Sequence, residues 1–250
     1  MKKKQKYNNE EYIVYGINGC LNLLKTKKTK IIAIDIMQSS TAEKNGEIKH
    51  YCVKRKHLLR IIPKDQFLKK YPKIRSQGII IKLLYHSNNN LPNYDNREGH
   101  ICLLMIDNLE DPQNLGQIVR TAECCGVEGI IIPKHKSVGV TNTVLQVSQG
   151  AFLDLPIYIS NNLRNDIKIL KKQGFWSVAL ENSINAEKWH DIDLRGKTLI
   201  VIGGEGKGVR QLVMKECDFQ ATIPMQGKIN SLNVSAAASA ILCERLRQIG

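Results

Sequence analysis

The feature that most constrains the fold of this chain is a short, strictly apolar run that ends in a glycine-rich turn. Residues 199–202 read LIVI and residues 203–208 read GGEGKG. An apolar run bounded by glycines predicts a buried strand, and glycines after a strand let a backbone or a ligand approach closely. A helix-like segment, an apolar run at 221–225 and SLNVS at 231–235 follow. The stretch therefore predicts strand, turn, helix, strand and final helix, with an unliganded tight turn as the alternative for the glycines alone.

The same alternation begins at residue 101. Apolar runs predict strands at 101–106, 129–132, 155–159 and 175–180, and helical spacing predicts helices at 114–125, 141–150, 163–172 and 234–248. Strands separated by helices indicate an α/β fold with a mainly parallel sheet and helices on both faces. Ligands of such sheets bind beyond the carboxyl ends of the strands, which is where the glycine turn lies.

Composition divides the chain into two parts. Residues 1–86 predict a small α/β domain with strands at 31–37 and 78–84, residues 87–99 (SNNNLPNYDNREG) predict a linker, and residues 100–250 a second domain. Residues 1–100 hold 21 Lys and Arg against 8 Asp and Glu, and the remaining residues hold 16 against 15. Nearly all of the net charge of +14 therefore belongs to the first part. This indicates a basic module that binds a polyanion, with general lysine enrichment as the alternative.

Other patterns exclude several classes of protein. The seven cysteines form no CxxC pair and the six histidines no ligand spacing, so we expect no metal site and a reducing, cytoplasmic location. No apolar run reaches the roughly 20 residues of a membrane span, and no apolar segment follows the basic start, so secretion is not expected. The turn is not a nucleotide P-loop, because Gly208 follows Lys207, and Val209 breaks the dinucleotide-binding pattern.

A second motif, DPQNLGQIVR, occupies residues 111–120. Asn114 is the expected helix N-cap, with Gln117 three residues later as in a capping box. Gly116 and Arg120 then share one helical face, so Arg120 can reach over the bare glycine toward the helix start. Helix amides and a guanidinium together favour an anion. The alternative is a capped helix with an exposed arginine.

Three blocks in this order carry a resemblance to a known family. They are NxGxxxR at 114–120, IGGEGKG at 202–208, and IPM at 223–225 followed by SLNVS. Together they resemble the SpoU/TrmH branch of the SPOUT methyltransferases over about residues 101–248. The first part resembles, through YGIN at 15–18 and QGI at 77–79, the ribosomal-protein-like RNA-binding domain of ribosomal-RNA ribose methyltransferases.

The resemblance implies a deep trefoil knot at the C-terminal end of the sheet and a homodimer whose interface adjoins the cofactor site. It also implies S-adenosylmethionine as the cofactor. The residues that would hold it are Gly203, Gly204, Ile223, Met225 and Leu232.

The implied reaction is methylation of a ribose 2′-hydroxyl in RNA. Arg120 would be oriented by the substrate phosphate and help to activate the hydroxyl. A guanidinium with a pKa above about 12 is a poor base, so a role as base and a role as electrostatic stabiliser both stay open. The implied positioning groups, for which helix capping or loop hydrogen bonding is the alternative, are Asn114, Glu205, Ser231 and Asn233.

The substrate implied by this domain combination is a guanosine of large-subunit (23S) ribosomal RNA. A transfer-RNA enzyme of the same branch is the nearest alternative, although such enzymes generally lack a separate first domain of this size. A non-catalytic RNA-binding protein of ribosome assembly is the alternative from another class.

Overall fold

The computed structural model describes residues 10–182, 186–204 and 208–250, which form two compact units. The first unit contains the described residues up to His86 together with Thr141–Leu153. The second contains the described parts of Ser87–Val140 and Asp154–Gly250.

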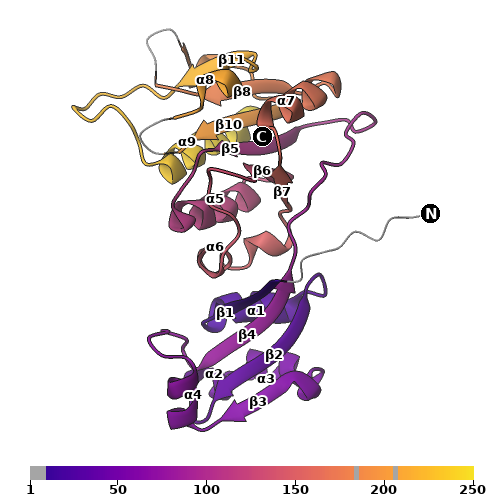
Figure 1. Ribbon diagram of the computed structural model, residues 1–250, viewed down its shortest axis with the longest axis vertical. Coiled ribbons are helices and arrows are strands. Elements are labelled where there is room, and N and C mark those ends of the chain that lie inside the picture. Colours follow the sequence, from indigo (N-terminus) through magenta and orange to yellow (C-terminus); the bar gives the residue numbers. More distant parts are fainter. Residues whose placement is uncertain (1–9, 183–185, 205–207) are drawn as a thin grey trace. The chain divides into compact units, whose positions relative to one another are not determined.

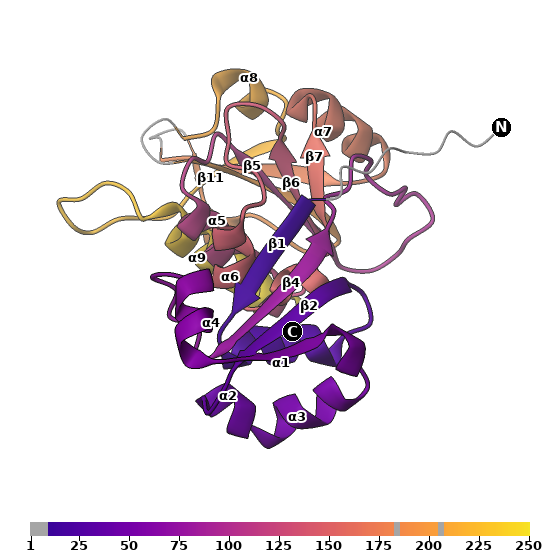
Figure 2. The same cartoon turned by 60° about the horizontal axis from the view of Figure 1, so that its bottom comes forward.

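The elements of the first unit are β1 (Glu10–Tyr15), α1 (Ile17–Lys25), β2 (Lys30–Met37), α2 (Thr41–Lys44), α3 (Gly46–Val53), η1 (Lys56–Leu58), β3 (Leu59–Ile62), α4 (Lys64–Lys70), β4 (Ile79–Tyr85), α6 (Asn142–Val147) and η2 (Ala151–Leu153). Among the described residues its strands form one sheet in the order β1-β4-β2-β3. β4 is antiparallel to both β1 and β2, and β3 is parallel to β2; Figure 2 shows β1, β4 and β2 side by side. The strands expected at 31–37 and 78–84 are thus present as β2 and β4.

Helix α6 belongs to the first unit although it follows two strands of the second in the chain. Its side-chain amides pair with the backbone of edge strand β1. Asn142 Oδ1 accepts from Ile13 N at 2.8 Å, and Gln146 accepts from Tyr15 N at 2.8 Å and donates to Tyr15 O at 2.9 Å. These bonds satisfy backbone groups that an open sheet edge would leave exposed.

One buried carboxylate binds part of the positive charge of the first unit. Asp35 of β2 is 1% exposed and contacts Arg60 at 2.6 Å, Lys70 at 2.7 Å and the Tyr71 hydroxyl at 2.5 Å. Burial alone would raise the pKa of Asp35, but hydrogen bonds from Lys70, Tyr71 and Arg60 outweigh it and lower that pKa. Two cations of this basic unit therefore have a structural partner.

The elements of the second unit are β5 (Ile101–Asp107), α5 (Pro112–Cys124), β6 (Gly129–Pro133), β7 (Ile157–Ser160), α7 (Leu163–Lys172), β8 (Trp176–Leu180), β9 (Glu187–Lys188), η3 (Trp189–Asp191), β10 (Lys197–Gly203), α8 (Gln211–Met214), β11 (Phe219–Thr222) and α9 (Val234–Ile249). Its described strands form one sheet in the order β7-β6-β5-β10-β8-β11-β9, and every pairing among them is parallel. The predicted α/β class with a mainly parallel sheet is confirmed.

Helices cover both faces of this sheet, with α5 and α9 on one face and α7 and α8 on the other (Figure 1). Every residue of β5 is buried. Its alternate residues Ile101, Leu103 and Met105 join a core cluster with side chains of α7 and α8. Because side chains alternate along a strand, the residues between them face α5 and α9. This double burial explains why the central strands are continuous apolar runs.

The segment predicted as a linker, residues 87–99, is packed against the second unit. Asn88 bridges to Tyr158 beside β7, with hydrogen bonds from Asn88 N to Ile157 O at 2.8 Å and from Ile159 N to Asn88 O at 2.7 Å. Tyr94 is 1% exposed, with its ring centroid 5.3 Å from that of Phe175. These contacts could not be predicted from the sequence, because most residues of the segment are polar.

Within the described ranges, no helix is both long and apolar enough to cross a membrane. In the same residues, no cluster of three or more His, Cys, Asp or Glu side chains is arranged to hold a metal ion.

Candidate functional site

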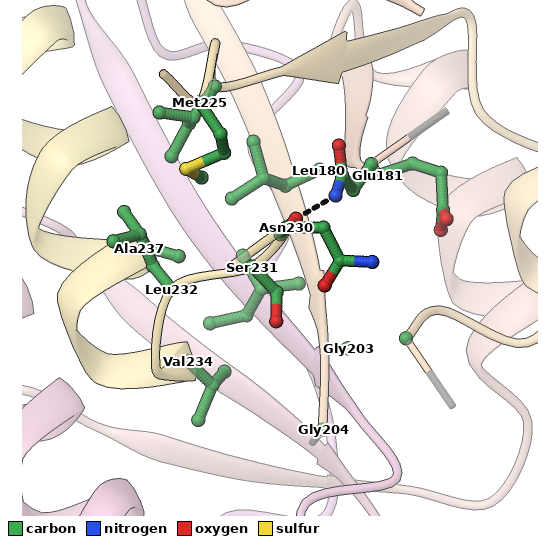
Figure 3. A pocket seen from close by; sticks show the side chains of 14 residues that line it. Leu180, Glu181, Gly203, Gly204, Met225, Asn230, Ser231, Leu232, Val234 and Ala237 are labelled. Atoms are coloured by element: carbon green, nitrogen blue, oxygen red, sulfur yellow. Dashed lines mark hydrogen bonds between the residues drawn. The ribbon is translucent and has the colours of Figure 1, made fainter. Parts of the chain in front are cut away.

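A cavity of about 450 Å³ opens where strands β8, β10 and β11 end (Figure 3). This is the edge at which parallel sheets bind ligands, and the volume is that of a small-molecule site. The lining residues are Leu180, Glu181, Asn182, Ile202, Gly203, Gly204, Gly208, Ile223, Met225, Asn230, Ser231, Leu232, Val234 and Ala237.

At two of the lining glycines, main-chain atoms occupy the space that a side chain would need. A Cβ at Gly203 would lie 1.9 Å from the carbonyl carbon of Gly208, and one at Gly204 would lie 2.0 Å from Asn108 O. Both distances are far below van der Waals contact, and the atoms met are main-chain atoms that cannot rotate away. The glycine turn therefore brings three stretches of backbone together at the end of β10, as its composition predicted.

Asp107, the last residue of β5, holds both ends of this turn. Its carbonyl accepts from Gly204 N at 2.8 Å. Its carboxylate, which is fully buried, accepts from Arg210 N at 2.9 Å, Arg210 Nε at 2.8 Å and Arg210 Nη2 at 2.7 Å. A backbone carbonyl and a carboxylate of one residue thus fix the turn at residues 204 and 210.

All five residues predicted to hold a cofactor line this cavity. They are Gly203, Gly204, Ile223, Met225 and Leu232. In Figure 3, Met225, Leu232 and Ala237 lie on one side of the cavity and Glu181 on the other. The arrangement offers an apolar wall for a flat ring system opposite a carboxylate that can accept hydrogen bonds or face a cation. The roles of the five residues stay predictions.

Three polar residues of the lining were missed by the sequence reasoning: Glu181, Asn182 and Asn230. Glu181 N donates to Ala221 O at 2.8 Å, and a Cβ at Gly208 would lie 3.3 Å from Glu181 Oε2, so this carboxylate lies against the glycine turn. Asn182 Nδ2 donates to Asn230 O across the cavity. The available signal was the change from apolar to polar at the end of the predicted strand 175–180, a place where ligand-binding residues gather.

Asn114 and Asn233, predicted as positioning groups, contact each other outside the cavity lining. Asn233 Nδ2 donates to Asn114 Oδ1 at 3.1 Å. Asn233 Oδ1 also accepts from Ser235 N at 2.9 Å, so Asn233 is the N-cap of α9. Ser235 Oγ lies 2.7 Å from Gln117 Oε1 of α5. The two motifs thus meet through polar contacts between α5 and α9, and capping accounts for part of the role of Asn233.

The helix that carries Arg120 begins earlier than expected. Asp111, not Asn114, is the N-cap of α5, because its carboxylate accepts from Gln113 N at 2.8 Å and Pro112 suits the first helical position. Asn114 instead lies inside the first turn and is buried. This leaves its amide available for contacts with α9.

The remaining predicted residues lie in three different settings. Arg120 is exposed on α5, and its side chain makes no hydrogen bond or ion pair within the described part of the chain. It does not line the cavity. Ser231 lines it and is exposed. Glu205 lies outside the described residues.

Comparison with known proteins gives a family match over the second unit. The sequence model of the SpoU rRNA Methylase family matches residues 102–243. Over 146 residues the chain is 46% identical to a protein of Staphylococcus saprophyticus named as a TrmH family tRNA/rRNA methyltransferase, and the match covers 58% of each chain. This chain therefore spans less than two thirds of the length of that curated relative.

Two solved structures share the fold over nearly the whole chain. The SpoU methyltransferase AviRb of Streptomyces viridochromogenes, crystallised with AdoMet, is 22% identical, with a TM-score of 0.78 over 95% of this chain and 90% of that chain. An RNA 2′-O ribose methyltransferase is 23% identical, with a TM-score of 0.76 over 96% of this chain and 89% of that chain.

Proposed function

This chain belongs to the SpoU rRNA Methylase family, and from that premise we propose that it transfers a methyl group from S-adenosylmethionine to a ribose 2′-hydroxyl of RNA. One observation carries the proposal. The five residues that the motifs predict as cofactor contacts line a single cavity at the carboxyl edge of the parallel sheet. The related structures, one crystallised with AdoMet and one of an RNA 2′-O ribose methyltransferase, support the choice of donor and acceptor.

The residues of the cavity fit such a cofactor. The volume of about 450 Å³ suits a small molecule of this kind, and the bare Gly203 and Gly204 bring main-chain groups to the cavity surface. The apolar side at Met225, Leu232 and Ala237 suits an adenine ring, and the Glu181 carboxylate suits ribose hydroxyls or a positive sulfonium. When bound, the cofactor supplies an electrophilic methyl group.

The chain itself must position the ribose and lower the proton affinity of its hydroxyl. Arg120 is the group we assign to this task. Its guanidinium binds the substrate phosphate and stabilises negative charge that develops on the hydroxyl oxygen, a role that suits a side chain which stays protonated at neutral pH. Asn114 and Asn233 fix the start of α5, the helix that carries Arg120, against the start of α9. Glu205 and Ser231 are the further positioning groups of the proposal.

We assign the active form to a homodimer. Arg120 lies outside the cavity lining of its own chain, and the loop between β11 and α9 projects from the sheet, as Figures 1 and 2 both show. On that loop Ile229 is 77% exposed and Leu232, which lines the cavity, 43% exposed. A second copy would cover these apolar side chains and place its own Arg120 at the cavity mouth. Light scattering that reports a monomer at working concentration would reject this assignment.

A trefoil knot is part of the same proposal. The three motif blocks that carry the family resemblance, and the family match over residues 102–243, support it.

The substrate we propose is a guanosine of 23S ribosomal RNA, bound by the basic first unit. The relative from Staphylococcus saprophyticus carries both tRNA and rRNA in its name, so transfer RNA is the second candidate.

Titration calorimetry with S-adenosylmethionine tests the class first, and one binding site per chain is expected. Incubation with total RNA from cells lacking this gene, followed by mapping of ribose methylation, then tests the substrate. A new methylated guanosine in 23S RNA is expected. Modified tRNA with untouched rRNA would reject the substrate, and failure to bind the cofactor would favour the non-catalytic alternative.

A further inference from the structure

A second cavity of the same unit gathers positive charge. It measures about 370 Å³ and lies where β6 and β7 end, beside the starts of α7 and α8. Its lining includes four cations, Lys134, Lys136, Arg164 and Arg210, together with His135. None of the residues that line it is acidic. Because residues 101–250 hold nearly equal numbers of acids and bases, this local excess is not a consequence of composition.

The charges of this basic cavity differ in how they are partnered. Arg210 is bound to Asp107, and Arg164 to Glu216 with Nη2 to Oε1 at 2.6 Å. Lys134 and Lys136 are exposed, and among the described residues neither ammonium has an acceptor or an ionic partner. Two ammonium groups at the cavity are therefore available to an anionic ligand.

The loop that carries these lysines is anchored on both sides. Lys134 N donates to Ser160 O at 2.8 Å. Ser137 Oγ donates to Leu109 O at 2.9 Å, and Leu109 follows the Asn108 carbonyl against which Gly204 packs. The backbone of the lysine loop is thus bound to the end of β7 and to Leu109, beside the residue against which Gly204 packs.

The basic cavity and the cofactor cavity lie on neighbouring parts of one turn. Gly208 lines the cofactor cavity, and Arg210 lines the basic cavity. Two residues of chain span at most about 7 Å, which is the scale of a single nucleotide. An RNA strand that reaches the cofactor cavity near Gly208 therefore passes within about one nucleotide of Arg210, one of the cations of the basic cavity.

We propose that the basic cavity is a phosphodiester subsite for the RNA strand that flanks the target nucleotide, with Lys134 and Lys136 as its phosphate-binding residues. This rests on the proposed function, since it extends the same RNA across the catalytic unit. Leu212, 59% exposed at the rim, offers an apolar contact for the adjacent base. The subsite would bind the strand independently of the basic first unit and so fix its direction at the site.

The test compares two double variants of the full chain. In Lys134→Gln/Lys136→Gln the subsite loses both free charges. In the matched control, Lys172→Gln/Lys215→Gln, two exposed lysines outside the cavity lose the same charge, and neither ammonium has a partner among the described residues. Binding of a fluorescent 12-nucleotide single-stranded RNA is measured by anisotropy across a KCl series, and cofactor affinity is measured by calorimetry.

Loss of two phosphate contacts should reduce the slope of log affinity against log salt by about 1.4, which is about 25-fold weaker binding at 0.1 M if the lines meet at 1 M. Cofactor affinity and the melting temperature should match those of the unaltered chain, and the control should keep the original slope. An unchanged slope in the subsite variant, an equal loss in the control, or no RNA binding by the unaltered chain would each overturn the proposal. A chain that fails to bind cofactor rejects the proposed function instead, and the salt series still decides the subsite.

Discussion

At Gly204, one added methyl group meets a main-chain oxygen at 2.0 Å. Gly204→Ala should therefore displace either the turn or residue 108, and we expect cofactor affinity to fall at least about tenfold, with a lower melting temperature. Gly139→Ala is the matched control, because nothing lies within 4 Å of a Cβ there and its φ is outside the left-handed region. Calorimetry and thermal denaturation measure both variants. Equal behaviour of the two would show that the close approach at Gly204 does not shape the cofactor cavity.

Substitution of Arg120 should affect turnover rather than folding. This arginine is exposed and without a partner in the described residues, so Arg120→Ala removes little from folding. We expect methylation to fall by at least about 100-fold and RNA affinity at 0.1 M salt by no more than about fivefold, the loss of one phosphate contact, while the melting temperature and cofactor affinity stay close to those of the unaltered chain. Arg195→Ala removes an exposed arginine whose ion pair, as far as the described residues show, is with Asp193, and it should leave turnover unchanged. Single-turnover methylation separates the variants, and retained turnover in Arg120→Ala would remove this residue from the mechanism.

At this scale, the resemblance carried by the three motif blocks implied Gly203, Ile223 and Leu232 as cofactor contacts, and all three line the cavity. Glu181 could not be predicted in this way, because a single acid after an apolar strand is a common pattern that becomes informative only when its neighbours in space are known. The N-cap at Asp111 was missed for a related reason. Both Asp111 and Asn114 are good capping residues, and the choice between them depends on where the chain leaves β5.

The ends of the elements, rather than their interiors, build the site. Asp107 ends β5 and binds the first and last parts of the glycine turn that follows β10, two strands that are neighbours in the sheet but separated by about 90 residues in sequence. The buried carboxylate has three hydrogen bonds from one arginine, which is the strong, charge-assisted type.

Asp107→Asn keeps the side-chain volume and the backbone carbonyl but removes the charge. Because Arg210 is 43% exposed, we expect a loss of about 2 kcal/mol in the free energy of unfolding, below the value for a fully buried pair. That corresponds to a melting temperature lower by about 4–8 °C, together with weaker cofactor binding because the turn loses one anchor. Asp193→Asn changes an aspartate whose arginine pair is exposed on both sides and should cost less than about 0.5 kcal/mol. Similar losses of unfolding free energy in the two variants would show that the Asp107 carboxylate does not fix the turn.

Long elements were predictable and short ones were not. The apolar runs that became β5 and β10 need burial on both faces, which only a central strand of a parallel sheet gives. The strands β3 and β9 are short and carry exposed residues, so no periodicity marks them. The strand that follows the glycine turn was predicted at 221–225 but ends at Thr222 as β11, because Pro224 cannot donate to a sheet ladder.

At the scale of the whole molecule, the order of the elements along the chain differs from their grouping into compact units. The sequence places α6 between strands β6 and β7, and its contacts with β1, far away in the chain, are among those that assign it to the first unit. Periodicity identifies the helix, but it carries no information about which distant strand edge the amides of Asn142 and Gln146 reach. The charge division was visible in the sequence because it depends on composition alone.

This interleaving predicts how a truncated chain behaves. Removal of residues 1–86 should deprive α6 and η2 of their partners, since Leu145 is fully buried and Phe152, 2% exposed, lies with its ring 5.3 Å from that of Tyr85. We therefore expect the truncated chain to bind a hydrophobic dye and to aggregate at a lower temperature than the full chain. Leu145→Ser/Phe152→Ser should restore solubility to the truncated chain but destabilise the full one, because the same side chains are exposed in the first and buried in the second. A truncated chain that binds no dye and melts like the full chain would show that residues 141–153 do not depend on the first unit. In that case, a loss of RNA binding by the truncated chain would be caused by removal of the basic first unit and not by disturbance of residues 141–153.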